Sequence, residues 1–412
     1  MTRDFHVSRR SVTRSALLGS AALLLGGGGG AARAATSPPP VRGDAVLTLP
    51  APTGPHPVGR RSVHLVDTSR PDPLSPGCPV RELMLTLYYP ARDVTGLARA
   101  PQLPARAAAA FGQIAPFGPL HLPAAGVDWS ATASHSYEDA PALPGRRPVL
   151  VHSPGGGDPR GWGTCLAEDL AAHGAVVVSV DHPGDAAAVE FPDVTPYRPE
   201  PVRETVLRGE PRDEPALWRT LIDVRIADLH FVLGRLRDPA GLPLPDGLAG
   251  ALDARRVGVY GHSAGGSAVT EVLFEDRRIR AGINLEGYLD HPPTEPGGPA
   301  VPFPVVAHGL DRPLLLLGSD GFDHRRELAR SWQPLAARSP GRVRSARVAG
   351  AGHWTFTDFA AVLPQLRAAG LTTADRCRAL IGTAGPEVSV PYVRRTVRAF
   401  FARHLSTRQG AP

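Results

Sequence analysis

Residues 257–266, with the sequence VGVYGHSAGG, constrain the fold of this chain more than any other stretch. The first four residues predict a buried strand, and the small residues Gly266, Ser267 and Ala268 predict the start of a helix. The turn between them is a G-x-S-x-G centred on Ser263, a pattern typical of a sharp strand-to-helix turn that exposes a serine hydroxyl. Its glycines are needed because a Cβ two residues from the serine would strike the neighbouring strand or helix. The stretch therefore predicts a nucleophilic serine at the end of a strand.

Strand and helix patterns alternate along much of the remaining chain. Strands are expected at 61–66, 82–89, 148–152, 175–180, 256–260, 281–285, 313–317 and 343–348, and helices at 162–173 and 217–237. Leu83, Leu85 and Leu87 should share one face of their strand. Alternation of this kind predicts an α/β fold with a mostly parallel central sheet and helices on both faces. Ligands bind at the carboxyl ends of the strands in such a sheet, and the motifs fall there.

The first 57 residues differ in composition from the rest of the chain. Residues 1–35 predict a twin-arginine signal peptide, because Arg9 and Arg10 precede an apolar run and a small-x-small cleavage site at Ala32–Ala34. Residues 36–57 are rich in proline and predict a linker. A single catalytic domain is expected over 58–408, with lid or insert loops near 98–144 and 186–215. The expected location is therefore extracellular.

Composition limits the other functional classes. The formal charge of +6 comes from scattered arginines and not from a basic stripe, so nucleic-acid binding is not expected. The three cysteines, Cys78, Cys165 and Cys377, lack the spacing of a metal site, so no metal is expected. In an exported protein they allow one disulfide or three buried thiols.

A serine hydroxyl needs a base, and that base needs an acid to orient it. The best base is His353, which follows the last expected strand in the glycine-rich loop GAGHW. His308, His324 and His404 are its competitors. Two carboxylates could orient the imidazole, because Glu286 ends one strand and Asp320 follows the next. The sequence pattern alone leaves both open.

The developing oxyanion needs two backbone N–H donors. One is expected from Ala264, directly after the nucleophile, and the other from the loop 153–157, SPGGG, whose glycines let the backbone approach the substrate. A phosphate-binding loop is excluded because no G-K-[ST] follows. Gly155, Gly157, His262 and Trp354 are expected to line the substrate pocket, Trp354 because it neighbours the proposed base.

Several blocks together resemble the plasma-type platelet-activating factor acetylhydrolases and their bacterial relatives among the α/β-hydrolases. The similar blocks are LVDTSRPDP at 65–73, YYPA at 88–91, EDLAAHG at 168–174, GHSAGG at 261–266, EDRRIRAGINLEG at 275–287 and GHWTFTDF at 352–359. They occur in the family's order and span most of the chain after residue 57. The resemblance is therefore more specific than the serine turn alone.

The resemblance implies an α/β-hydrolase fold, and it assigns the nucleophile to Ser263 and the base to His353. It assigns the acid to Glu286, where the family pattern has Asp, and this departure keeps Asp320 as the second choice. It assigns the second oxyanion donor to Gly156. It also implies catalysis without a metal or an organic cofactor.

The expected function is a secreted serine carboxylic-ester hydrolase, an esterase or lipase that cleaves short-acyl esters or phospholipids through an acyl-enzyme. Its partners would be a small-molecule or lipid ester and, transiently, a lipid surface. One alternative is a lipase or polyester hydrolase with an open groove. The other is a non-catalytic exported binding protein on a hydrolase scaffold, which the complete set of serine, acid and histidine disfavours.

Overall fold

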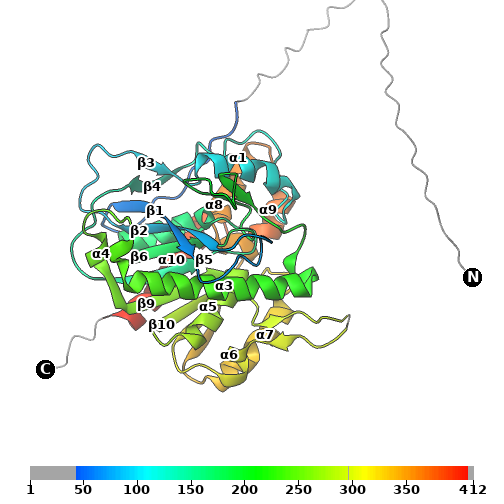
Figure 1. Cartoon of the computed structure of the whole chain (residues 1–412). Coiled ribbons are helices and arrows are strands. Elements are labelled where there is room, and N and C mark those ends of the chain that lie inside the picture. Colours follow the sequence, from blue (N-terminus) through cyan, green and yellow to red (C-terminus); the bar gives the residue numbers. More distant parts are fainter. Residues whose placement is uncertain (1–42, 296, 407–412) are drawn as a thin grey trace, which may run out of the picture. The chain divides into compact units, whose positions relative to one another are not determined.

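A ten-stranded sheet lies at the centre of the computed structural model, which describes residues 43–295 and 297–406 (Figure 1). In spatial order its strands are β14 (Val343–Val348), β13 (Leu314–Ser319), β10 (Ile279–Leu285), β9 (Leu252–His262), β5 (Arg147–Ser153), β6 (Val176–Asp181), β2 (Arg81–Pro90), β1 (Val58–Asp67), β4 (Ala133–Glu138) and β3 (Arg99–Pro101). From β14 to β6 every neighbouring pair is parallel. β2 pairs antiparallel with both β6 and β1. The predicted α/β fold with a mostly parallel central sheet is confirmed.

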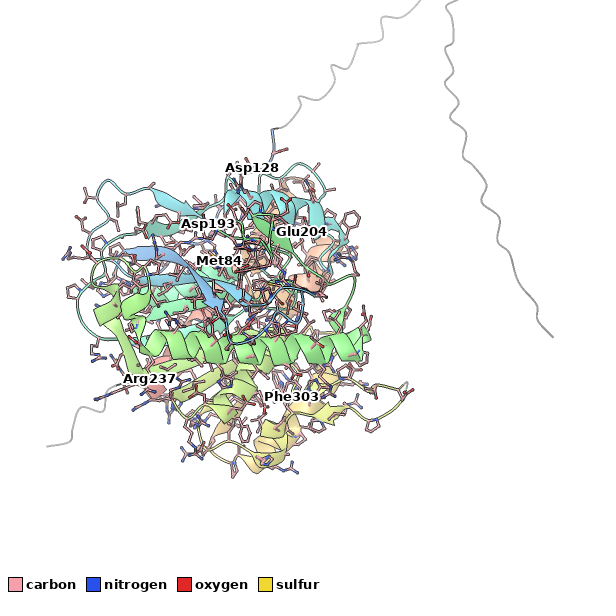
Figure 2. All side chains as sticks on the ribbon, in the orientation of Figure 1. Met84, Asp128, Asp193, Glu204, Arg237 and Phe303 are labelled. Carbon is pink, nitrogen blue, oxygen red and sulfur yellow. The ribbon has the colours of Figure 1, made fainter. Side chains whose placement is uncertain are left out.

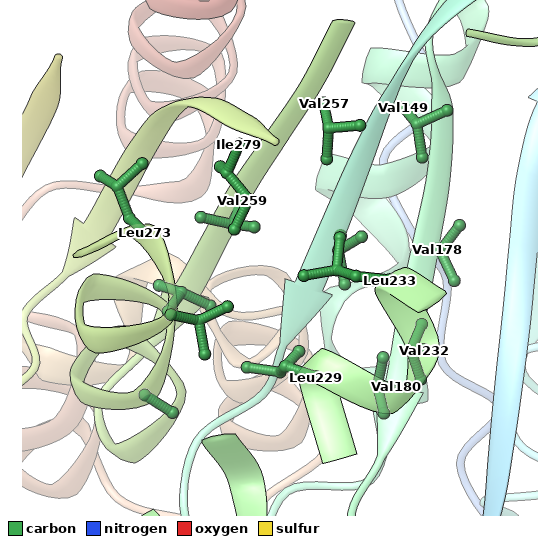
Figure 3. Close-up of a cluster of buried hydrophobic side chains, with 14 of the residues drawn as sticks. Val149, Val178, Val180, Leu229, Val232, Leu233, Val257, Val259, Leu273 and Ile279 are labelled. Carbon is green, nitrogen blue, oxygen red and sulfur yellow. The ribbon is translucent and has the colours of Figure 1, made fainter. Parts of the chain in front are cut away.

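Helices cover both faces of this sheet. One face packs against α3 (Pro215–Arg237), α5 (Ala264–Glu275), α6 (Pro304–His308) and α7 (Arg325–Arg338), and the other against α2 (Thr164–Ala172) and α10 (Pro386–Leu405). Alternate residues of a strand point to opposite faces. In β5, Val149 and Val151 therefore join the first core, whereas Leu150 joins the second. Figure 3 shows the first core, where Leu229 of α3 packs among strand valines.

A third cluster joins α1 (Ala105–Ile114), α8 (Phe359–Ala368) and α9 (Ala374–Ile381). It also contains Leu47 and Leu49, which belong to the predicted linker. The Thr53 N–H donates to Asp169 at 2.8 Å. Residues 43–57 therefore pack on the domain, because their leucines bury apolar surface there. The high proline content of the segment had suggested a linker instead. The predicted signal peptide and residues 36–42 lie outside the described residues.

The two expected inserts contain strands that the sequence did not predict, whereas the one or two short helices expected within 98–144 are present as α1 and the 3-10 helix η1 (Ala115–Phe117). Residues 98–144 hold β3, α1, η1 and β4. Residues 186–215 hold a hairpin of β7 (Ala188–Glu190) and β8 (Val202–Glu204), followed by η3 (Pro211–Asp213). Val189 and Phe191 pack on Met84 of β2, and Asp193 and Glu204 are exposed (Figure 2). The second insert is therefore anchored to the sheet.

The remaining elements are short: η2 (Arg160–Gly163), η4 (Pro239–Gly241), α4 (Leu248–Ala251), β11 (Asp290–His291), β12 (Val301–Pro302) and η5 (His353–Phe356). Within residues 43–295 and 297–406, none of the helices combines the length and apolarity that a membrane crossing requires.

Candidate active site

Ser263 occupies a strained turn between β9 and α5. Its backbone has φ 51° and ψ −121°, in a region that non-glycine residues rarely adopt. A Cβ on Gly261 would lie 2.4 Å from the carbonyl carbon of Gly265, and a Cβ on Gly265 would lie 2.0 Å from the Ser153 carbonyl oxygen. The turn therefore requires both glycines, as predicted. Ser263 itself is half-buried at the carboxyl end of the central strands.

A buried carboxylate lies one strand away. Glu286 follows β10 with φ 62°, and its Oε2 lies 2.9 Å from Nδ1 of His353. Because a carboxylate only accepts, Nδ1 carries the proton and Nε2 keeps its lone pair. Oε1 accepts from the Ser319 hydroxyl at 2.8 Å and from the Ser319 backbone N–H. Three donors thus hold the Glu286 carboxylate behind the imidazole.

Of the two acid candidates, only Glu286 contacts the histidine among the described residues. The Asp320 side chain is exposed. The backbone carbonyl of Asp320 accepts a hydrogen bond from the Arg325 side chain. The competing histidines lie elsewhere: His324 pairs with Glu327, and His308 bonds its own helix. The geometry therefore joins Glu286 to His353, whose ring lies against that of His262, the residue before Ser263.

Aromatic side chains fix the His353 ring. Phe322 stacks on it with centroids 4.6 Å apart and planes at 19°, and His262 lies 4.5 Å away. His262 Nε2 lies 3.0 Å from the His353 carbonyl oxygen, which can only accept. Burial lowers the pKa of His262, so a neutral His262 donates this bond. Trp354 contacts both His262 and His353 edge-on or tilted.

Two neighbouring backbone N–H groups beside Ser263 have no acceptor in the described part of the chain: those of Gly156 and Ala264. Ala264 is the first residue of α5, so no earlier helical carbonyl faces its N–H. A Cβ on Gly156 would lie 3.8 Å from the Ala264 Cβ, so the two groups are close. The N–H of Gly157 is used differently, because it donates to Asp185 at 2.9 Å. A Cβ on Gly155 would strike His262 Nδ1 at 2.9 Å.

Four large aromatic residues lie in the core. Trp129, Trp162, Phe191 and Trp218 are all buried. Ser319 and Phe322 were not predicted as site residues. Ser319 could have been found because it directly precedes Asp320 at a strand end, whereas no sequence pattern marks Phe322 as the partner of His353.

The cysteines are free and buried at all three positions. No group of three or more His, Cys, Asp or Glu within the described residues is arranged to hold a metal ion.

Comparisons with known proteins show what the chain is similar to. The model of platelet-activating factor acetylhydrolase, isoform II, matches residues 245–410, a range that includes Ser263, Glu286 and His353. A probable 1-alkyl-2-acetylglycerophosphocholine esterase of Arthroderma benhamiae is 26% identical over 370 residues, which are 86% of this chain and 87% of that protein. The chain is therefore similar to the platelet-activating factor acetylhydrolases, and it has an α/β-hydrolase fold.

A second curated protein and a solved structure are also similar to the chain. The platelet-activating factor acetylhydrolase of Cavia porcellus is 25% identical over 287 residues, which are 63% of this chain and 57% of that protein. A solved structure of ferulic acid esterase from Streptomyces cinnamoneus superposes with a TM-score of 0.68 and 33% identity, over 89% of this chain and 97% of that one. The protein is a carboxylic ester hydrolase.

Proposed function

We propose that the protein is a serine esterase that cleaves short-acyl esters or acyl phospholipids through a covalent acyl-enzyme. The observation that carries the proposal is the 2.9 Å hydrogen bond between Glu286 and His353 beside the strained Ser263. It leaves the imidazole in the tautomer that a general base needs. Nε2 of His353 is then free to accept the serine proton.

The reaction follows from these positions. The Ser263 hydroxyl attacks the ester carbonyl as His353 takes its proton, and the N–H groups of Gly156 and Ala264 stabilise the oxyanion. His353 returns the proton to the leaving alcohol, which leaves an acyl group on Ser263. Water then attacks the acyl-enzyme as His353 takes its proton, and His353 returns that proton to the Ser263 oxygen as the carboxylic acid leaves. Glu286 keeps the imidazole oriented and stabilises its protonated form.

A second chain of serine, histidine and acid exists in the protein, and its burial argues against catalysis there. Ser153 Oγ lies 2.9 Å from His182 Nε2, and His182 Nδ1 lies 2.9 Å from Asp228. The three residues are 0%, 1% and 0% exposed, so substrate cannot reach them. Labelling with a fluorophosphonate followed by peptide mass spectrometry separates the two serines. We expect the label on Ser263, and a label on Ser153 would contradict the proposal.

A short acyl group is favoured over an open groove by the second insert. Leu207 and Pro211 lie 3.8 Å from Cβ positions built on Gly157 and Gly156. Arg212 holds this segment through Asp290 at 2.9 Å and lies 3.7 Å over the Tyr288 ring. The insert therefore covers residues 153–157, the oxyanion loop, and limits the space for a long acyl chain or a polymer.

A second candidate substrate is an aryl-acid ester. The neighbour that shares 33% identity is described as a ferulic acid esterase. Phe322 on His353 and Tyr288, 6.4 Å from Phe322, offer aromatic faces next to the site. A flat aryl acyl group could stack against them.

Hydrolysis of p-nitrophenyl acetate, butyrate and palmitate, of methyl ferulate and of an acetylated glycerophosphocholine tests the proposal. We expect the acetyl and butyryl esters to be cleaved faster than palmitate, and Ser263→Ala to lose activity while keeping its thermal midpoint. A preference for palmitate would favour the open-groove lipase. A wild-type protein that cleaves none of these esters and takes no fluorophosphonate would instead be a binding scaffold.

We further propose export through the twin-arginine leader and transient contact with lipid surfaces. Replacement of Arg9 and Arg10 by lysine should retain the protein inside the cell if the leader is used. Sequencing of the mature N-terminus tests cleavage after Ala34. Co-sedimentation with phospholipid vesicles tests the lipid contact.

A further inference from the structure

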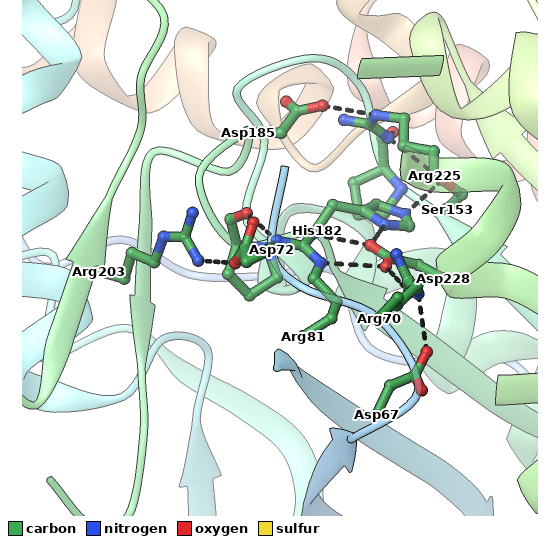
Figure 4. A network of polar contacts seen from close by, with 12 residues as sticks. Asp67, Arg70, Asp72, Arg81, Ser153, His182, Asp185, Arg203, Arg225 and Asp228 are labelled. Carbon is green, nitrogen blue, oxygen red and sulfur yellow. Dashed lines mark hydrogen bonds and ion pairs between the residues drawn. The ribbon is translucent and has the colours of Figure 1, made fainter. Parts of the chain in front are cut away.

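The guanidinium of Arg225 donates several hydrogen bonds to the oxyanion loop, residues 153–157. Arg225 lies on α3, is 1% exposed and contacts the loop that follows β5 (Figure 4). Its Nη1 donates to the Pro154 carbonyl at 2.7 Å and to the Ser153 hydroxyl at 3.2 Å. Its Nη2 donates to the Gly155 carbonyl at 2.9 Å. The two carbonyls that precede Gly156 are therefore both turned toward Arg225.

Asp185 binds both Arg225 and the backbone on the other side of Gly156. Its Oδ2 accepts from Arg225 Nε at 2.6 Å, and its Oδ1 accepts from the Gly157 N–H at 2.9 Å. One buried ion pair thus binds the peptide groups before and after Gly156. Gly156 is half-exposed and lies next to Ala264. Its N–H has no acceptor among the described residues.

We propose that Arg225 and Asp185 are positioning residues that aim the Gly156 N–H at the oxyanion. The inference rests on the proposed function, because it names the residues that position an oxyanion donor of that reaction. Neither residue touches substrate. A loop rich in glycine has many accessible backbone conformations, and the ion pair selects the one that presents this donor before substrate arrives.

The Arg225–Asp185 ion pair, here called the clamp, contacts a buried polar network. The Ser153 hydroxyl lies 2.9 Å from His182 Nε2, and His182 Nδ1 lies 2.9 Å from Asp228, which forms an ion pair with Arg81 at 2.8 Å (Figure 4). Burial and the Arg225 charge lower the pKa of His182, against the opposing effect of Asp228. A neutral His182 donates to Asp228 and accepts from Ser153. Ser153 in turn accepts from Arg225, so the guanidinium has one orientation.

Lysine cannot replace this arrangement. A guanidinium presents five donors in a rigid plane, whereas an ammonium is a point charge on a flexible stem. Arg225→Lys keeps the positive charge beside Asp185 and loses the simultaneous bonds to both carbonyls. The variant therefore separates the fork geometry from the charge.

The chain contains a matched control. Arg394 on α10 is 4% exposed, and its guanidinium donates to the carbonyls of Ala51 at 2.7 Å, Pro50 at 2.9 Å and Cys165 at 2.9 Å. It is a buried arginine fork on backbone carbonyls, and none of its acceptors belongs to the oxyanion loop. Arg394→Lys should therefore cost stability of a similar kind without altering oxyanion stabilisation.

The test compares wild type, Arg225→Lys, Asp185→Asn and Arg394→Lys on p-nitrophenyl acetate and on its thiono analogue. Active sites are titrated with a fluorophosphonate, and thermal midpoints are recorded. Sulfur is a poor hydrogen-bond acceptor, so an aligned oxyanion hole favours the oxygen ester, and the ratio of the two kcat/KM values is independent of how much protein is folded. We expect kcat per active site to fall about 10- to 100-fold in Arg225→Lys, with KM within about threefold and a lower ratio. Asp185→Asn should lower the same ratio, and Arg394→Lys should leave it unchanged.

An unchanged oxygen-to-thiono ratio in Arg225→Lys would overturn the inference and make the clamp purely structural. A ratio that falls equally in Arg394→Lys would overturn it as well. If Arg225→Lys does not fold, Asp185→Asn decides the question by the same ratio. Failure of the proposed function would look different, because wild type would then be no more active than Ser263→Ala.

Discussion

Replacing Glu286 by glutamine changes one carboxylate oxygen into an amide and little else. In the native site, Oε1 accepts from the N–H and the hydroxyl of Ser319, and Oε2 accepts from Nδ1 of His353. A glutamine oxygen that keeps the two Ser319 donors turns its NH₂ group toward His353. Nδ1 must then accept, and the imidazole proton moves to Nε2. In this tautomer His353 cannot take the proton of Ser263.

The size of the loss follows from that tautomer. When the acid behind a catalytic histidine is replaced by its amide, kcat falls by about 10⁴-fold, which corresponds to about 5 kcal/mol of transition-state stabilisation. We expect Glu286→Gln to lose about 10³- to 10⁴-fold in kcat with little change in KM, because Glu286 does not touch substrate. Folding should be affected little, since the amide keeps the Ser319 contacts.

The assay is p-nitrophenyl acetate hydrolysis, normalised to sites that react with a fluorophosphonate and accompanied by a thermal melt. Asp320→Asn is the matched control, because the Asp320 side chain is exposed and should leave kcat unchanged. Glu286→Asp restores the residue expected in the family pattern with a side chain one carbon shorter. It should retain more activity than the amide, because a carboxylate still accepts from Nδ1.

Two results would refute this reasoning. Activity of Glu286→Gln within tenfold of wild type would mean that the carboxylate does not orient His353. Loss of activity in Asp320→Asn with Glu286→Gln unaffected would move the acid to the next strand, which was the second choice from the sequence.

Three further changes test the surrounding structure. Gly265→Ala would place a Cβ 2.0 Å from the Ser153 carbonyl oxygen, so we expect a displaced oxyanion loop and a stability loss of about 1–3 kcal/mol, measured by kcat per titrated site and by urea unfolding. Leu229→Ala should cost about 2–5 kcal/mol in the same unfolding assay, because Leu229 is 0% exposed in the core, and a loss below 1 kcal/mol would contradict its packing. Burial raises the pKa of Glu168 to about 7 from 4.5, so the folded state retains a proton that the unfolded chain releases, and stability should fall as the pH rises from about 4.5 to 7. Glu168→Gln should remove that part of the slope and gain up to about 3 kcal/mol at pH 8, and parallel pH profiles for the two proteins would exclude the assignment.

Local patterns in the sequence were sufficient for the elements that carry the chemistry. The strand predicted at 343–348 is β14 to the residue. The long helix α3 begins at Pro215, two residues before its predicted start. β3, β4 and the β7–β8 hairpin were not predicted. Their residues lack strong periodicity and become strands only by pairing with a partner distant in the sequence or across a loop.

The sequence by itself determined the serine turn, the parallel sheet that places strand ends together, and the histidine in the last glycine-rich loop. Those features depend on the backbone conformations and hydrophobic periodicity of neighbouring residues, and both can be read from the local sequence. Only the tertiary structure decided between Glu286 and Asp320 as the partner of His353, because both follow strands and the choice depends on which side chain turns inward. It alone revealed Phe322 on the imidazole and Arg225 on the oxyanion loop. Such contacts join residues about 30 to 70 positions apart, and a hydrogen bond or a ring stack across that separation leaves no pattern in neighbouring residues.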